Sequence, residues 1–284
     1  MLDTKAQEIF VLSRDVTVIG KVGRSGEGPG EYRNPARLGV DLAHGRWMVY
    51  DPAIGRVTYL DSIGRVTRIV ATNATNVEDI VGQDGAAYFT HVLIPELFER
   101  GESFRVMLST QGPTATETAV ISRTAVPRNT DALPMPGPNR LRAARHKDRM
   151  FLFSPASNIV QVFDGSQPTA VIRTCMPSDV RKAYDRQREL HENGRRGNSQ
   201  QGFPLITDVM MRGDTVFVVG PLRDQAERLH VDRYALDGTS LGSVTAFVGS
   251  GGFPLDVRFW GDPYDLVAFG PHGTILRVVV EPTP

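Results

Sequence analysis

The sequence predicts an all-β protein, a β-propeller made of four-stranded antiparallel blades. Apolar runs of four to eight residues recur along the chain and are separated by Gly, Asp and Pro. Several runs reach an Asp-containing turn and double back, at intervals of 46, 103 and 73 residues between Asp15, Asp61, Asp164 and Asp237. These intervals fit one unit, two units, and one unit with an insertion. A period of about 45 residues with four strands per unit is typical of propeller blades.

Five blades can be placed in order along the chain. The clearest is residues 36–71, where four strands follow one another through tight turns: Arg37–Leu42, Arg46–Tyr50, Arg56–Leu60 and Val66–Val70. Each strand shows either alternating polar and apolar residues, as in a half-buried strand, or a continuous apolar run, as in a fully buried strand. The same spacing of strands and turns assigns further blades to residues 76–121, 138–173, 203–246 and 253–280. We therefore expect a single propeller domain over residues 1–284.

The number of blades depends on how the N-terminal strands are used. The last assigned blade shows three strands: Leu255–Trp260, Asp265–Phe269 and Thr274–Val280. The simplest fourth strand is Val16–Val22, which would close the ring and leave Ile9–Leu12 as an extra strand of a five-bladed propeller. The alternative is a six-bladed propeller whose first blade lacks its inner strands.

Two segments interrupt the strand pattern. Residues 124–138 are rich in Pro and polar residues, which predicts a long loop. Residues 176–202 contain a short amphipathic stretch that begins at Ser178, a suitable N-cap, and predict a helix. Because this insertion joins two blades, we expect it to cap one face of the propeller, with Tyr184 and Phe203 lining a pocket.

Composition excludes several classes of protein. The 284 residues carry 32 Lys and Arg against 32 Asp and Glu, which argues against a strongly basic nucleic-acid binder. The lone Cys175 cannot form an internal disulfide, and no apolar run approaches the roughly 18 residues that span a bilayer. The first residues, Met1–Lys5, lack the features of a signal peptide. We expect a soluble protein held together by its core.

One motif resembles a known family. Residues 23–35 read Gly-Arg-Ser-Gly-Glu-Gly-Pro-Gly-Glu-Tyr-Arg-Asn-Pro. They resemble the connection between blades in bacterial six-bladed propellers related to NHL-repeat proteins, where G-x-G-P-G-E-[FY]-x-x-P leads into an inner strand. The match covers about residues 7–70, and the family would have two more strands before Asp3. The resemblance implies a propeller and leans towards an extracytoplasmic location, but this diverse family implies no particular chemistry.

The glycines of this motif are not expected to bind phosphate. A phosphate-binding loop needs a helix directly after it, whereas Pro35 and a strand follow here. Gly26, Gly28 and Gly30 instead suit a tight connection that needs positive φ angles.

The candidate ligand site is the face where the inner strands of a propeller begin, around the mouth of its channel. Its residues would be Arg37, Glu78, Asn139, Arg140, Arg142, Asp208, Asp256 and Arg258. Three interpretations are open. The arginines could hold an anion or carboxylate, since guanidinium groups suit such ligands. The oxygen ligands Glu78, Asn139, Asp208 and Asp256 could hold Ca²⁺. The third interpretation is a set of salt bridges between blades.

No complete catalytic constellation is evident, so catalysis stays an alternative. The six histidines are scattered without metal-ligand spacing. The candidate catalytic residues are His91, Asp208 and Asp256, although a core histidine with satisfied hydrogen bonds is the commoner role for His91. The predicted function is binding of a small organic or peptide ligand. No cofactor is expected, and Ca²⁺ stays an open alternative. The alternatives are a propeller hydrolase or lyase at the same mouth, and a scaffold that binds a protein partner through an apolar rim.

Overall fold

The chain forms two compact units, whose described residues form β-strands, turns and connections. The computed structural model describes residues 1–13, 15–41, 44–83, 85–92, 103–112, 114–115, 117–127, 142–146, 149–153, 158–164, 167–174, 206–223, 228–247, 256–260, 262–269 and 275–280. Unit 1 comprises Met1–Glu99 and Phe104–Ala125, and unit 2 comprises Arg100–Ser103 and Val126–Pro284. The fold is a six-bladed β-propeller with mostly four-stranded antiparallel blades, and no helix occurs among the described residues.

Unit 1 contains blades 1 to 3. Blade 1 has β1 (Leu2–Asp3), β2 (Glu8–Leu12) and β3 (Val18–Val22). Blade 2 has β6 (Arg37–Asp41), β7 (Arg46–Asp51), β8 (Arg56–Leu60) and β9 (Val66–Ala71). Blade 3 has β10 (Val77–Gln83), β11 (Ala86–Val92), β12 (Ser103–Gln111) and β13 (Ala119–Pro127). The connection between blades 1 and 2 carries a short parallel pair, β4 (Arg24–Ser25) and β5 (Glu31–Tyr32).

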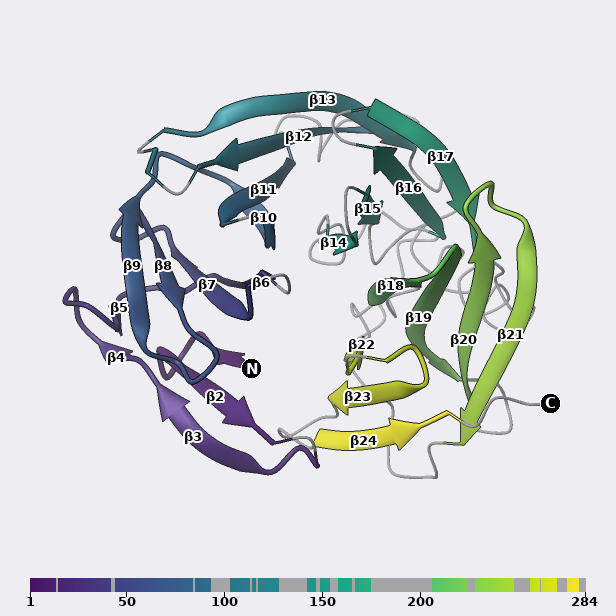
Figure 1. Cartoon of the computed structure of the whole chain (residues 1–284), viewed down its shortest axis with the longest axis horizontal. Coiled ribbons are helices and arrows are strands. Elements are labelled where there is room, and N and C mark those ends of the chain that lie inside the picture. The colour runs from purple at the N-terminus through teal and green to yellow at the C-terminus, as the bar shows by residue number, and fades with distance from the viewer. Residues whose placement is uncertain are drawn as a thin grey trace, which may run out of the picture. The chain divides into compact units, whose positions relative to one another are not determined.

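Unit 2 contains blades 4 to 6. Blade 4 has β14 (Arg142–His146), β15 (Arg149–Phe153), β16 (Ile159–Asp164) and β17 (Gln167–Arg173). Blade 5 has β18 (Asp208–Arg212), β19 (Thr215–Arg223), β20 (Arg228–Ala235) and β21 (Ser240–Phe247). Blade 6 has β22 (Asp256–Phe259), β23 (Asp265–Phe269) and β24 (Ile275–Val279). Within each blade the strands lie side by side in chain order (Figure 1).

The aspartates that mark the turns close them through their side chains. Asp61 Oδ1 accepts hydrogen bonds from the backbone N–H groups of Ile63 at 3.0 Å and Arg65 at 2.8 Å. Asp237 does the same for Thr239 at 2.8 Å. Aspartate favours such turns because its carboxylate can replace a backbone acceptor. The recurring Asp in the sequence pattern is thereby explained at these two turns.

The hydrophobic core lies between neighbouring blades rather than within them. Each strand presents alternate side chains to the two faces of its blade, and within each unit the facing sides of neighbouring blades pack together. The described residues form four such clusters. They are led by Ile9, Tyr32 and Leu60 between blades 1 and 2, by Tyr50, Val57 and Phe89 between blades 2 and 3, by Phe151, Val216 and Tyr234 between blades 4 and 5, and by Phe217, Val257 and Leu266 between blades 5 and 6.

The first strands of blades 2 and 3 approach each other at glycines. A Cβ atom on Gly39 of β6 would lie 2.5 Å from the carbonyl oxygen of Ile80 on β10. A Cβ atom on Gly82 would lie 2.6 Å from Cβ of Asp41. Only glycine permits backbones this close. The spacing of β6 and β10 therefore depends on Gly39 and Gly82.

The structure corrects the predicted role of the N-terminal strands. Val16–Val22 does not complete the last blade; β3 begins at Val18 and pairs with β2 in blade 1. Val16 itself has φ of 59° and lies in a turn, where Ser13 N donates to Thr17 O at 2.8 Å. The five-bladed alternative is therefore wrong, and six blades are confirmed. Blade 1 is less incomplete than that alternative expected, because β1 pairs with β2 on its inner side.

Two predictions about the interrupting segments have different outcomes. The expected loop over residues 124–138 is wrong at its start, because β13 continues to Pro127. The rest of that loop lies outside the described residues. The expected helical cap over residues 176–202 also lies outside the described residues, together with Tyr184 and Phe203.

We predict that Gly39→Ala destabilises the protein by about 1–3 kcal/mol, because the added methyl group meets a backbone oxygen that cannot move alone. The matched control is Gly20→Ala in β3, where the nearest atom to an added Cβ is Val11 Cβ at 4.0 Å. That control should be neutral or slightly stabilising. Urea unfolding of the two variants measures the difference, and equal midpoints would contradict the close approach.

Candidate functional site

The starts of the inner strands in unit 1 bring together two predicted site residues. Arg37 is the first residue of β6, and its Nε donates to the backbone oxygen of Glu78 at 2.6 Å. Its Nη1 donates to the backbone oxygen of Ala36 at 2.7 Å. The third guanidinium nitrogen, Nη2, lies 3.7 Å from Glu78 Oε2. Both side chains are mostly buried, so this ion pair is partly shielded from water.

An irregular backbone presents Glu78 to this arginine. Asn76, directly before β10, has φ of 52°, in the left-handed region that few residues other than glycine adopt. The pairing of β10 with β11 then shifts between Val77 and Asp79, which leaves Glu78 as the extra residue of a β-bulge. Bulges and left-handed residues redirect side chains and are frequent next to functional sites. Glu78 Oε2 is buried and accepts no hydrogen bond within the described part of the chain.

His91 on β11 lies opposite Val77 and is almost completely buried. Its Nδ1 is 2.7 Å from the backbone oxygen of Thr75, which can only accept, so Nδ1 carries the proton. Its Nε2 then accepts from the hydroxyl of Ser109 at 2.7 Å. Burial lowers the pKa of His91, against the opposing effect of the Thr75 hydrogen bond. Both ring nitrogens are engaged, as in a structural core histidine, and neither offers a lone pair to a substrate.

In unit 2 the starts of the inner strands are joined by polar contacts. Arg142 Nη1 donates to the backbone oxygen of Thr207 at 2.9 Å. The buried Thr207 hydroxyl donates to Val257 O at 2.7 Å. Asp208 Oδ2 accepts from the backbone N–H of Phe259 at 3.0 Å, and Oδ1 lies 3.9 Å from Arg258 Nη1. These contacts connect blade 4 to blade 5 and blade 5 to blade 6 within unit 2.

The remaining predicted site residues are less fully described. Asn139 and Arg140 lie outside the described residues, and Asp256 begins β22 without a described side chain. The predicted set is therefore observed as an Arg37–Glu78 pair in unit 1 and as Arg142, Asp208 and Arg258 in unit 2. The common site for all eight stays a prediction.

A metal site gains little support from the described side chains. No group of three or more His, Cys, Asp or Glu among them is arranged to hold a metal ion. The two described Ca²⁺ candidates, Glu78 and Asp208, each have an arginine within 4 Å. A guanidinium at that distance competes with a cation for the carboxylate.

Among the described residues, no helix is long and apolar enough to cross a membrane.

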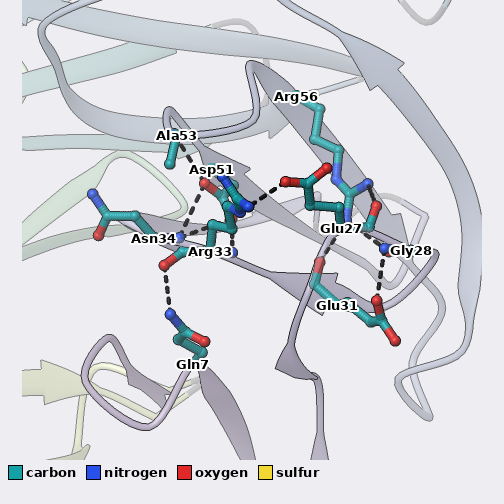
Figure 2. Close-up of polar contacts among 9 residues, drawn as sticks. All are labelled: Gln7, Glu27, Gly28, Glu31, Arg33, Asn34, Asp51, Ala53 and Arg56. Atoms are coloured by element: carbon teal, nitrogen blue, oxygen red, sulfur yellow. Dashed lines mark hydrogen bonds and ion pairs between the residues drawn. The ribbon is translucent and has the colours of Figure 1, made fainter.

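The glycine-rich motif forms a connection that blade 2 holds by two side chains (Figure 2). Asp51, the last residue of β7, is completely buried. Its carboxylate accepts from the backbone N–H groups of Arg33 at 2.7 Å, Asn34 at 3.1 Å and Ala53 at 3.0 Å. Three donors aimed at one buried carboxylate compensate for its loss of water.

Arg56 at the start of β8 holds the other end of the connection (Figure 2). It donates to the backbone oxygens of Glu27 at 2.6 Å and Gly28 at 2.8 Å, and to that of Glu31. Glu31 in turn accepts from the N–H of Gly28 at 2.8 Å, which lowers the pKa of its carboxyl group. Gly26 and Gly30, with φ of 147° and 74°, allow the tight path between them.

This network includes residues that the sequence pattern did not single out. Arg56 was expected only as the start of a strand, and Asp51 only as a residue of the turn before Pro52. Tyr32 of the motif is completely buried between blades 1 and 2, and burial raises its pKa to about 12. Through these contacts the motif has a structural role, because it attaches the connection after blade 1 to blade 2.

The buried neutral His91 predicts a pH dependence of stability. The folded-state pKa lies below the unfolded value of about 6.5, so the unfolded state binds more protons as pH falls through that value. Stability should therefore fall on acidification from pH 8 to pH 5. His91→Gln should cost about 1–3 kcal/mol at pH 8, and its deficit relative to the native chain should shrink towards pH 5.

Urea unfolding at several pH values measures this effect. Ser109→Ala is the matched control, because it removes the same hydrogen bond but keeps the titrating ring. Its deficit should not shrink with acidification as that of His91→Gln does. A deficit of His91→Gln that stays constant from pH 8 to pH 5 would contradict a depressed pKa for His91.

Comparisons with known proteins identify a fold and no family. No family model matches the chain, and no curated protein matches it by sequence. The structure of a Bacteroides fragilis protein described as exported is similar, with TM-score 0.51, 13% identity, and coverage of 94% of this chain and 75% of the other. The WD40 repeats of RRP9 are similar with TM-score 0.50, 10% identity, and coverage of 98% and 89%. The chain is thus a six-bladed β-propeller that shares its fold, at low identity, with such proteins.

Proposed function

We propose that this propeller is a binding protein that takes a small organic or peptide ligand where its inner strands begin. The observation that carries the proposal is the Arg37–Glu78 pair, in which the bulge and left-handed Asn76 hold a carboxylate that accepts no described hydrogen bond. A strained backbone and a buried carboxylate oxygen without a hydrogen-bond donor both cost folding free energy. Ligand binding at Glu78 would be a reason for the protein to keep this arrangement.

The geometry favours a ligand that donates hydrogen bonds. Arg37 uses Nε and Nη1 on backbone oxygens, which fixes its guanidinium group and holds Nη2 at 3.7 Å from Glu78 Oε2. We therefore assign Arg37 to positioning Glu78 rather than to binding an anion. The carboxylate of Glu78 is an acceptor only, and the group that best complements it is the ammonium group of a protonated amine.

We also propose kinship with the bacterial six-bladed propellers related to NHL-repeat proteins. The support is that the residues carrying the resemblance act together. Gly28, Gly30 and Glu31 form one hydrogen-bonded turn, and Tyr32 anchors it in the core. A motif with several positions that act in one turn is more informative than a chance match of glycines.

The experiment is a thermal-shift and calorimetric screen of the whole chain with free amines, amino acids and dipeptides, each beside its N-acetylated form. An amine-bearing probe at about a hundred times its Kd should stabilise the fold by about 2.7 kcal/mol, which raises Tm by about 5 °C. Acetylation of the probe should remove the rise, because it removes the charge that Glu78 complements.

Variants identify the residue responsible. Glu78→Gln should lose the shift, whereas Glu117→Gln, at an exposed position before β13, should keep it. Added Ca²⁺ followed by a chelator tests the metal alternative in the same assay. Equal shifts for the native chain and Glu78→Gln, or no shift with any amine, would overturn the proposal.

A further inference from the structure

Two buried side chains hold the backbone directly before β10. Tyr50 Oη on β7 donates to the backbone oxygen of Ala74 at 2.6 Å. His91 Nδ1 on β11 donates to the backbone oxygen of Thr75 at 2.7 Å. Tyr50 and His91 are each 2% exposed, so both donors are shielded from water. The directions of two successive carbonyl groups are thus fixed, one from blade 2 and the other from blade 3.

The hydrogen bond to Thr75 sets the conformation of Asn76. A peptide unit is planar, so the Thr75 carbonyl and the Asn76 N–H turn together about the N–Cα bond of Asn76, and this rotation is the φ angle. The Thr75 carbonyl meets His91 Nδ1 while φ of Asn76 is 52°. On the other side of Asn76, the chain is fixed because Val77 pairs with His91 itself. The Asn76 side chain is exposed, so packing around it does not account for this left-handed backbone.

The conformation of Asn76 in turn decides where Glu78 points. The chain enters β10 at Val77, which is buried in the cluster between blades 2 and 3, and Glu78 is the extra residue of the bulge that follows. Arg37 Nε donates to the backbone oxygen of Glu78 at 2.6 Å, and Arg37 Nη2 lies 3.7 Å from its carboxylate. An extended Asn76 would redirect the start of β10 and change the register at the bulge, which would move Glu78 away from this position.

We propose that His91 is a positioning residue for the ligand site at Glu78. Its bond to Thr75 holds Asn76 in the left-handed region and so keeps the Glu78 carboxylate in place for the ammonium group of a ligand. A preformed acceptor needs no ordering when the ligand binds, which favours affinity. His91 acts through the backbone and does not touch the ligand. The ligand part of this inference rests on the proposed function, whereas the positioning can be observed without a ligand.

The first test compares His91→Phe with Ser109→Ala in the whole chain. His91→Phe keeps an aromatic ring but cannot donate to Thr75, whereas Ser109→Ala removes the hydrogen bond at the other ring nitrogen and leaves the Thr75 bond intact. The backbone chemical shifts of Asn76 distinguish a left-handed from an extended residue. They should change in His91→Phe and stay as in the native chain in Ser109→Ala, although both variants lose a buried hydrogen bond.

Binding of alaninamide, which carries an ammonium group and no carboxylate, measures the consequence by titration calorimetry. His91→Phe should weaken binding about tenfold or more, and Ser109→Ala should bind within about threefold of the native chain. Unchanged Asn76 shifts in a folded His91→Phe variant, or changed shifts with unchanged affinity, would overturn the proposal. Absence of binding to the native chain would overturn the proposed function and the ligand part of this inference, while the Asn76 shifts still decide the positioning.

A second pair of variants keeps the test decisive if His91→Phe folds poorly. Asn76 is exposed, so its substitution leaves the core unchanged. A β-branched residue avoids the left-handed region, whereas glycine adopts it readily. Asn76→Gly should therefore bind alaninamide about tenfold more tightly than Asn76→Val, with circular dichroism showing that both are folded. Equal affinities of these two variants would contradict the dependence of Glu78 on this backbone angle.

Discussion

The buried carboxylate of Asp51 is the interaction on which the arrangement of unit 1 depends. It accepts three backbone hydrogen bonds, two of them from the connection that leads out of blade 1. An ionised carboxylate without water is stable only if its oxygens are satisfied, and backbone N–H groups without partners are equally costly. Each side of this contact therefore requires the other. The connection cannot move away from blade 2 without exposing both.

The position of the connection affects the candidate site through a short series of contacts between β6 and its neighbours. Asp51 and Arg56 fix the chain on either side of Tyr32, and β6 begins with Arg37, two residues after Pro35. Two residues later, Gly39 brings β6 against Ile80 of β10. At that spacing Arg37 reaches the backbone and the carboxylate of Glu78. In this account, the glycine-rich connection, which has a structural role, determines where the Arg37–Glu78 pair lies.

The sequence was sufficient to predict strands and turns that are determined by residues close together in the chain. Alternating apolar residues and the Asp61 turn predict the four strands of blade 2 within one or two residues. The N-terminal strand could be placed either in the last blade or in a first blade, because periodicity says that a strand exists but not which strand it pairs with. The roles of Asp51 and Arg56 were missed for a related reason: their partners lie about 17 to 29 residues away along the chain. Nothing local in Asn76-Val77-Glu78 signals a bulge, so the Arg37–Glu78 contact could be proposed only as part of a larger set.

The most direct test of this account is hydrogen–deuterium exchange of Asp51→Asn against the native chain. An asparagine side chain has one carbonyl oxygen for the three donors, and its amide group repels them. We expect protection to be lost at Arg33 and Asn34 and to fall along β6 and at the start of β10, while β15 and β16 of unit 2 keep theirs. Loss confined to Arg33 and Asn34, with β6 and β10 unchanged, would show that the connection does not position the inner strands and would contradict the account.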